Sequence, residues 1–138
     1  MADDPVRELS DDECWAALRD APIGRIALAV AHEVDVFPIN FIVHEGALCF
    51  RTAPGTKLLE LSINDHVALE VDGFTDAAAW SVVVKGRAER VEAQAEIDEL
   101  EGLGLVPWIP TLKYRWVRIR PETVSGRGFR RAPEPDRG

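Results

Sequence analysis

The sequence has no apolar run approaching the roughly 18 residues that a membrane-spanning helix needs. Its first residues, MADDPVRELSDDE, are acidic, whereas secretory signals and mitochondrial presequences begin with basic residues. From these two absences we expect a cytoplasmic protein without a membrane segment. The 138 residues, of which 46% are hydrophobic and 29% charged, suffice for one globular domain and are too apolar for a disordered chain.

An excess of basic residues is also missing. The chain has 24 acidic and 16 basic residues and a formal charge of −8. Nucleic acids and anionic membranes attract basic surfaces, so neither is an expected partner. The basic residues gather in the segment 111–138, which holds 8 of them against 3 acids. This segment could pair with the acidic body, with a second subunit or with an anionic ligand, or it could be a solvated tail.

Cysteines and catalytic signatures are scarce. Cys14 and Cys49 are far apart, and each lies in an apolar pattern that is typical of a reduced, buried thiol. The chain has no dinucleotide-binding glycine motif, Walker loop, H-E-x-x-H or G-x-S-x-G motif. Its three histidines do not have the spacing of metal ligands. We therefore name no catalytic residue and no metal ligand.

Helical patterns occur at three places in the sequence. Ser10 and Glu13 have the spacing of a capping box at the start of the first helix. A helical turn is expected over 56–62, and an amphipathic helix over 93–103. Glycines and prolines in 102–112 indicate a loop that follows the last helix.

Six segments alternate apolar and polar residues with a period of two, which is typical of strands with one buried face. The expected strands are 24–30, 34–43, 47–52, 66–72, 80–91 and 114–121. Pro38 cannot donate a ladder hydrogen bond, so its strand should be bulged there or lie at a sheet edge. The order of elements predicts a mainly β fold, an antiparallel barrel with short helices, and an OB-type barrel is the topological alternative.

One segment, FRTAPGTK over residues 50–57, combines several groups that bind anions. A strand delivers Arg51 and Thr52, a Pro-Gly turn follows, and a helix begins near Thr56. Free amides at the helix start, the Thr56 hydroxyl and the Lys57 ammonium would form an anion cradle. The same residues also suit a surface helix with a solvent-facing lysine, and spacing alone does not decide between the two.

The succession GRIAL, VDVFPINFIV, ALCFRTAPGTKLLEL, VALEVD and WSVVVKGRA resembles the pyridoxamine 5′-phosphate oxidase-like, FMN-binding split β-barrel family. It is similar in particular to the small single-domain branch, with nitroimidazole-resistance-type proteins and actinobacterial flavin or deazaflavin reductases. The resemblance implies a six-stranded, Greek-key, antiparallel split β-barrel over residues 9–129. A flexible N-terminal segment, 1–8, and a flexible C-terminal tail, 130–138, would flank it.

The resemblance further implies a homodimer with FMN at the subunit interface. The residues implied to meet the cofactor are Pro38, Ile39 and Asn40 along the isoalloxazine ring, Arg51 and Thr52 at the ribityl-phosphate side, Thr56 and Lys57 at the phosphate, and Trp80 and Ser81 on a bordering strand. Trp116 and Arg118, on the last strand, are expected at the contact between subunits because tryptophan and arginine are enriched at interfaces.

The activity implied by the resemblance is hydride transfer between reduced flavin and a small organic substrate. The cofactor supplies this chemistry, so no protein acid or base is required. The chain lacks an obvious pyridoxal-phosphate-binding segment at its end, so oxidation of vitamin B6 is not expected. Two alternatives remain: a reductase that uses the deazaflavin F420, and a flavin-binding or sensor module without turnover.

Overall fold

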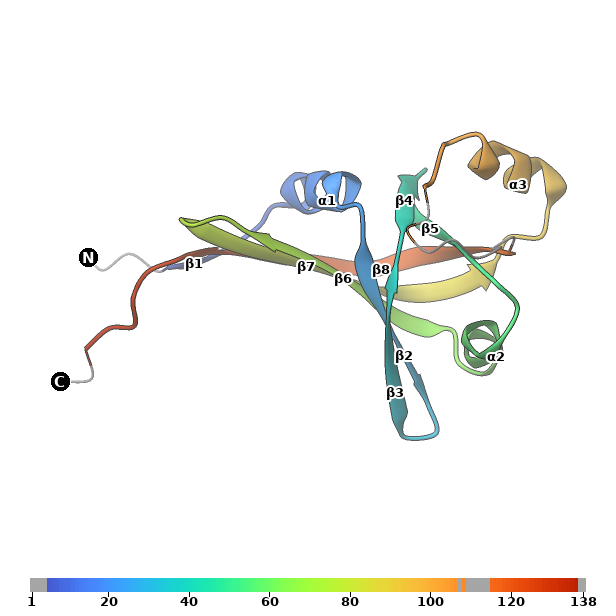
Figure 1. The fold of residues 1–138 in the computed structure, drawn as a ribbon, viewed down its shortest axis with the longest axis horizontal. Coiled ribbons are helices and arrows are strands. Elements are labelled where there is room, and N and C mark those ends of the chain that lie inside the picture. The colour runs from blue at the N-terminus through green and yellow to red at the C-terminus, as the bar shows by residue number, and fades with distance from the viewer. Residues whose placement is uncertain (1–4, 107, 109–114, 137–138) are drawn as a thin grey trace.

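The computed structural model describes residues 5–106, 108 and 115–136, which form one curled antiparallel sheet with three short helices (Figure 1). The strands are β1 (Val6–Glu8), β2 (Gly24–Val30), β3 (Glu33–Ile39), β4 (Phe41–His44), β5 (Ala47–Thr52), β6 (His66–Phe74), β7 (Ala78–Arg90) and β8 (Arg115–Arg130). The helices are α1 (Asp11–Asp20), α2 (Thr56–Ile63) and α3 (Gln94–Glu101). The expected mainly β antiparallel fold with short helices is confirmed.

The sheet curls because its two edge strands are consecutive in the chain. The strands follow the order β3-β2-β6-β7-β8-β5-β4, and β1 is added on β8. Only Asn40 separates β3 at one edge from β4 at the other. The two edges must therefore meet near Asn40, and the sheet has the form of a barrel that is split at this position.

The described residues form eight strands, so the prediction of six was wrong in number. The segment expected as one strand over 34–43 breaks at Asn40, because its two halves pair with different partners, β2 and β5. The short strand β1 was not anticipated and pairs with the far end of β8. β8 continues to Arg130, well beyond the expected end at residue 121. Tyr114 and part of the expected 102–112 loop lie outside the described residues.

The period-two patterns identified the core correctly. The side chains that the pattern places on the apolar faces of the strands are each at most 6% exposed and belong to the main core. They are Leu48, Phe50, Val67, Leu69, Val71, Val82, Val84, Val117 and Ile119. Burial of one such side chain contributes about 1.5–3 kcal/mol. Pro38 lies opposite Arg25 in an unbroken β2–β3 register, so it marks a sheet edge and no bulge.

α1 starts with the predicted capping box. The Glu13 amide donates to the Ser10 hydroxyl over 3.2 Å, and the Glu13 carboxylate accepts from the Ser10 amide over 3.0 Å. Cys14 and Leu18 of this helix are buried in the main core. No helix in the described part of the chain is long and apolar enough to cross a membrane.

α3 covers a second, smaller core on the other face of the sheet. Its buried residues are Cys49, Val91, Leu100 and Trp116, and the Trp116 indole N–H donates to Glu101 over 2.8 Å. Trp116 is only 2% exposed, so its expected place at a subunit contact is wrong: a helix of the same chain covers it. Both cysteines are free thiols, and burial raises the pKa of Cys49 to about 11.

Candidate functional site

Asn40 occupies the point where the barrel splits. Its side-chain amide donates to the Pro22 carbonyl over 2.9 Å, and its side-chain oxygen accepts from the Trp108 amide over 2.8 Å. Of its predicted neighbours, Pro38 is exposed and Ile39 is buried in the core. No described strand pairs with the second edge of β3, and this edge ends at Asn40, where the barrel splits.

Arg51 lies beside Asn40. The β4–β5 register pairs Phe41 with Phe50. Because the strands are antiparallel, Asn40, just before Phe41, lies next to Arg51, just after Phe50. The Arg51 guanidinium donates to the Leu105 carbonyl over 3.0 Å, approaches the Glu101 carboxylate to 3.5 Å and lies 5.5 Å from the centre of the Trp116 ring. Its Nε is buried and has no hydrogen-bond partner among the described residues. The structure therefore brings Asn40 and Arg51 together under the segment that follows α3.

Thr52 faces the other side of β5. Successive side chains of a strand point to opposite faces, and Thr52 is 7% exposed on the side of the main core. Its hydroxyl donates to the Ala53 carbonyl over 3.3 Å. A ligand at Arg51 would not touch the Thr52 side chain in this arrangement, so only the backbone of Thr52 is available there.

The predicted helix after the Pro-Gly turn is present as α2, which begins at Thr56. Gly55 caps it with φ 154° and ψ −159°, a conformation that is essentially reserved for glycine. No described side chain caps the first turn, and a Cβ at Gly55 would have no described atom within 4 Å. The helix start thus presents backbone amides in an open position, although the side chains of Thr56 and Lys57 lie outside the described part.

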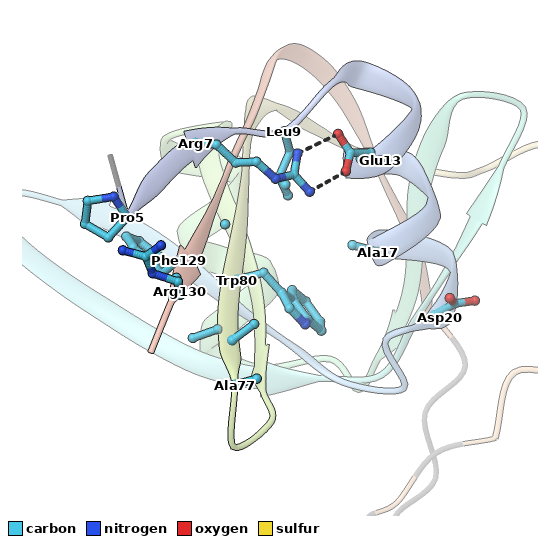
Figure 2. A pocket seen from close by; sticks show the side chains of 13 residues that line it. Pro5, Arg7, Leu9, Glu13, Ala17, Asp20, Ala77, Trp80, Phe129 and Arg130 are labelled. Atoms are coloured by element: carbon cyan, nitrogen blue, oxygen red, sulfur yellow. Dashed lines mark hydrogen bonds and ion pairs between the residues drawn. The ribbon is translucent and has the colours of Figure 1, made fainter. Parts of the chain in front are cut away.

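Trp80 and Ser81 point to opposite faces of β7, so the structure does not bring their side chains together. The Trp80 indole lies across Gly73, where a Cβ would overlap the ring. The indole lines a pocket of about 700 Å³ between α1, β1 and the ends of β7 and β8, at whose rim Arg7 pairs with Glu13 (Figure 2). Ser81 lies between Asp72 and Arg127 on the neighbouring strands.

The outer face of the sheet carries exposed apolar residues near the β3 edge. Val34 is 67% and Val36 is 59% exposed. In the register they lie beside Ala29 and Ala27 of β2, and Ala27 lies beside Ala68 of β6. A pocket of about 410 Å³ opens on this face. Apolar surface of this kind marks interaction sites in soluble proteins.

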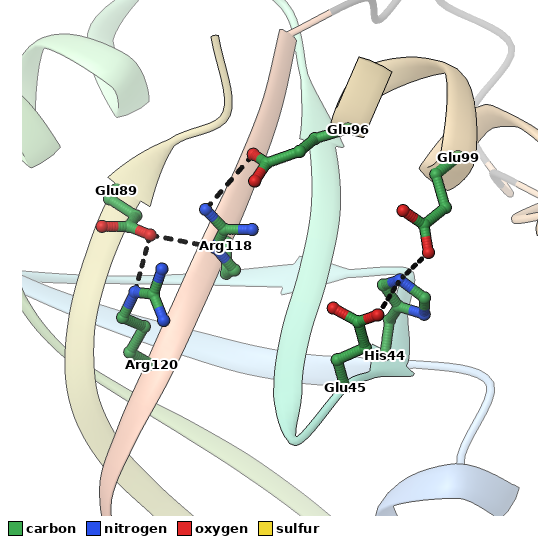
Figure 3. A network of polar contacts seen from close by, with 7 residues as sticks. All are labelled: His44, Glu45, Glu89, Glu96, Glu99, Arg118 and Arg120. Carbon is green, nitrogen blue, oxygen red and sulfur yellow. Dashed lines mark hydrogen bonds and ion pairs between the residues drawn. The ribbon is translucent and has the colours of Figure 1, made fainter. Parts of the chain in front are cut away.

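Arginines of β8 pair with the acidic body of the protein (Figure 3). The Arg118 and Arg120 Nε atoms lie 2.9 Å and 2.7 Å from the same Glu89 oxygen, and Arg118 also approaches Glu96 to 3.5 Å. Pairing with the acidic body of the protein is one of the alternatives that the sequence leaves open for the basic C-terminal segment. For Arg118 and Arg120 this alternative is confirmed. Arg118 makes these contacts within its own chain.

His44 forms a group with two acids that sequence spacing does not reveal. Its Nε2 lies 3.0 Å from Glu99 of α3 and 3.9 Å from Glu45 (Figure 3). Glu99 is 55 residues away in the chain, so only the docking of α3 brings it to the β4–β5 turn. These contacts fasten α3, and with it the segment that covers Arg51, to the sheet.

We expect Glu89 to make folding stability depend on pH. Burial alone would raise the pKa of Glu89, but hydrogen bonds from Arg118 and Arg120 outweigh it and lower the pKa from the ordinary 4.5. The stabilisation is therefore complete above about pH 4.5 and is lost as the pH falls through the lower, folded-state pKa. Because Glu89 is partly exposed, solvent screening limits the contribution to about 1 kcal/mol.

Urea unfolding of the Glu89→Gln variant at several pH values tests this expectation. The variant should be less stable than the wild type at pH 7, and the difference should shrink below pH 4.5. Glu92→Gln is the control, because exposed Glu92 makes no ion pair among the described residues. A Glu89→Gln deficit that stays constant from pH 7 to pH 3 would contradict the assignment.

The family model described as pyridoxamine 5′-phosphate oxidase matches residues 10–128 of the chain. A solved structure from Corynebacterium glutamicum, described as a candidate pyridoxamine 5′-phosphate oxidase, is 41% identical, with a TM-score of 0.84 over 96% of this chain and 100% of that chain. The FAD-binding protein from Mycobacterium smegmatis is 39% identical, with a TM-score of 0.78 over 89% of this chain and 98% of that chain.

An uncharacterised protein of Mycobacterium tuberculosis H37Rv is 43% identical over 96 residues, which are 70% of this chain and 87% of that protein. The two solved structures match nearly the whole described fold. Split-barrel architecture is thus shared with proteins of closely similar sequence, one of which is described as binding FAD.

Proposed function

The chain belongs to the pyridoxamine 5′-phosphate oxidase family, and we propose that it is an FMN-binding oxidoreductase. It would transfer hydride between reduced flavin and a small organic substrate. The observation that carries this proposal is the open start of α2, which follows the end of β5 after a short turn and has Gly55 as its N-cap residue, without a side-chain cap among the described residues. Backbone amides at a helix start favour a phosphate group, and the family context makes that phosphate the one of a flavin.

We assign the phosphate to Thr56 and Lys57 and to the amides of the first turn of α2. Arg51 and the backbone of Thr52, which end β5 just before this turn, would bind the ribityl-phosphate side. The buried Arg51 Nε has no hydrogen-bond partner in the described part of the chain, and this supports the assignment, because an unsatisfied buried donor is costly without an acceptor. Arg51 already meets the Leu105 carbonyl, so it is oriented before the cofactor binds.

We assign the isoalloxazine ring to the backbone of Pro38, Ile39 and Asn40. The second edge of β3 is unpaired among the described strands and ends where the barrel splits. Trp80 and Ser81 remain proposed as bordering residues, but a cofactor that lies flat on one face of β7 would meet only one of the two side chains.

These assignments separate the role of the cofactor in the reaction from the role of the protein. FMN supplies hydride transfer at its N5 atom when it is bound. The protein would bind the phosphate at α2 and position the ring on the β3 edge. A second protein surface on the other side of the ring would shield it from water. No described side chain near Asn40 has to move a proton in this scheme.

We propose a cytoplasmic homodimer, in which the partner subunit supplies the second wall. The apolar outer face around Val34 and Val36 is the surface that we assign to the partner, because it is continuous with the β3 edge of the cofactor site. Val36→Glu should produce monomers with weakened flavin binding, since the change buries a charge in the interface. Ala16→Glu, on the exposed side of α1, is the control and should remain dimeric.

Light scattering at micromolar concentration measures the oligomeric state of both variants. A Val36→Glu protein that stays dimeric would show that this face is not the interface. A wild-type monomer with bound flavin would contradict the dimer altogether.

Two other cofactors are alternatives. FAD is favoured by the M. smegmatis relative, which is 39% identical and described as an FAD-binding protein. F420 has a longer anionic tail that would suit additional arginines, but Arg118 and Arg120 are already paired with Glu89. We therefore place FMN first, because the turn at α2 suits a single phosphate.

The visible spectrum of the purified protein, with mass spectrometry of any released cofactor, tests the proposal. Titration with FMN, FAD and F420 then ranks the three. A protein that binds none of them would overturn the assignment. Oxidation of the bound, reduced cofactor that a substrate accelerates supports an enzyme, whereas binding without turnover in a screen of electron-poor aromatic compounds supports the sensor alternative.

A further inference from the structure

Trp108 is a large apolar side chain left in solvent. It is 60% exposed, and Val106, two residues before it, is 72% exposed. Tryptophan is enriched among the residues that contribute most to binding, because it provides a large rigid surface and loses little conformational entropy. The position of this exposed indole in the fold therefore bears on the site.

The backbone of the segment that carries Trp108 is held by two of the proposed cofactor residues. The Trp108 amide donates to the Asn40 side-chain oxygen over 2.8 Å, and the Leu105 carbonyl accepts from Arg51 over 3.0 Å. Asn40 is held in turn by the Pro22 carbonyl. These hydrogen bonds hold the backbone groups of Leu105 and Trp108 next to Arg51 and Asn40, while the Trp108 side chain itself is exposed.

We propose that the Trp108 indole stacks on the isoalloxazine ring and forms one wall of the cofactor site. This inference rests on the proposed function, because it assumes that a flavin ring lies along Pro38–Asn40. Asn40 then has two roles: its backbone borders the ring, and its side chain positions the tryptophan that covers the ring. Two flat aromatic systems attract one another in an offset stack, and each also shields the other from water.

The inference predicts which ligands lose affinity when Trp108 is changed. Trp108→Ala should weaken FMN and riboflavin binding by the same factor, about 3- to 10-fold, because both ligands carry the ring. Trp108→Phe should restore most of the affinity, since a smaller aromatic ring still stacks. A phosphate contact behaves differently, because its loss affects FMN and spares riboflavin.

Phe74→Ala is the matched control. Phe74 is also an exposed aromatic residue, 76% accessible, but it ends β6, a strand that pairs with β2 and β7 and with neither β4 nor β5. Its removal should leave the affinity for both ligands unchanged. Circular dichroism and light scattering on all variants show whether the fold and the oligomeric state are retained.

Titrations followed by flavin fluorescence give the dissociation constants. Equal affinities of wild type and Trp108→Ala for both ligands would overturn the stacking assignment while the flavin proposal stands. If Trp108→Ala loses flavin binding and also dissociates into monomers, the stacking assignment is likewise overturned, because Trp108 would then be a contact with the partner subunit. If the wild type binds neither ligand, the proposed function itself fails.

Discussion

Lys57→Ala should weaken FMN binding about 10- to 150-fold. The lysine follows Thr56 at the start of α2, where no described side chain caps the helix. Its ammonium would make a charge-assisted contact with the phosphate, worth roughly 1.5–3 kcal/mol, and this free energy corresponds to the stated range of dissociation constants. Isothermal titration of the wild type and the variant with FMN measures the change directly.

Riboflavin separates this contact from any other effect of the substitution. It has the same ring and ribityl chain as FMN but no phosphate, so the variant should bind it nearly as well as the wild type does. Arg19→Ala provides the control for charge, because it removes one positive charge from the exposed side of α1. An unchanged affinity for FMN in Lys57→Ala would leave a solvent-facing lysine on a surface helix as the interpretation.

Gly86→Ala should be among the most destabilising single substitutions in this chain. Gly86 lies opposite Pro121, where the β7–β8 register shifts and Glu122 is the extra residue. A Cβ at Gly86 would overlap the carbonyl oxygen of Arg120, which is backbone and cannot rotate away. The strands would have to separate, and we expect a loss of about 3 kcal/mol, at the upper end of the cost of overpacking.

The urea unfolding midpoint measures this loss, provided that the slope of the transition is unchanged. Gly102→Ala is the matched control, because Gly102 has φ −73° and a Cβ there would come no closer than 3.4 Å to a neighbouring atom. Its stability should stay within about 0.5 kcal/mol of the wild type. Equal midpoints for Gly86→Ala and wild type would show that β8 can shift without cost.

Local sequence signals were sufficient to predict structure where the deciding interaction joins residues that are close together in the chain. Ser10 and Glu13 are three residues apart, and their reciprocal hydrogen bonds define the start of α1 in any context. Alternation along β5 placed Phe50 in the core, and the conformation required at Gly55 follows from a turn between adjacent elements. The resemblance added the split-barrel family, and the family match over residues 10–128 confirmed this membership.

The break at Asn40 could not be predicted from its neighbours. The residues on both sides continue one apolar pattern, and the Pro38 signal indicates a sheet edge or a bulge without indicating that the strand ends at Asn40. The break arises because one half of the segment pairs with β2 and the other half pairs with β5, and these strands lie near opposite ends of the sheet. Pairing between distant strands is a property of the whole barrel, so a local pattern does not report it.

The sequence by itself determined the class of fold, the alternating core, the capped first helix and the turn that precedes α2, because each depends on neighbouring residues. The tertiary structure alone decided that α3 covers Trp116, that Glu89 binds Arg118, and that Trp108 meets Asn40. Trp108 and Asn40 are 68 residues apart in the chain. Such contacts exist only after the sheet has curled and brought its edges together, since no local preference of either residue requires them.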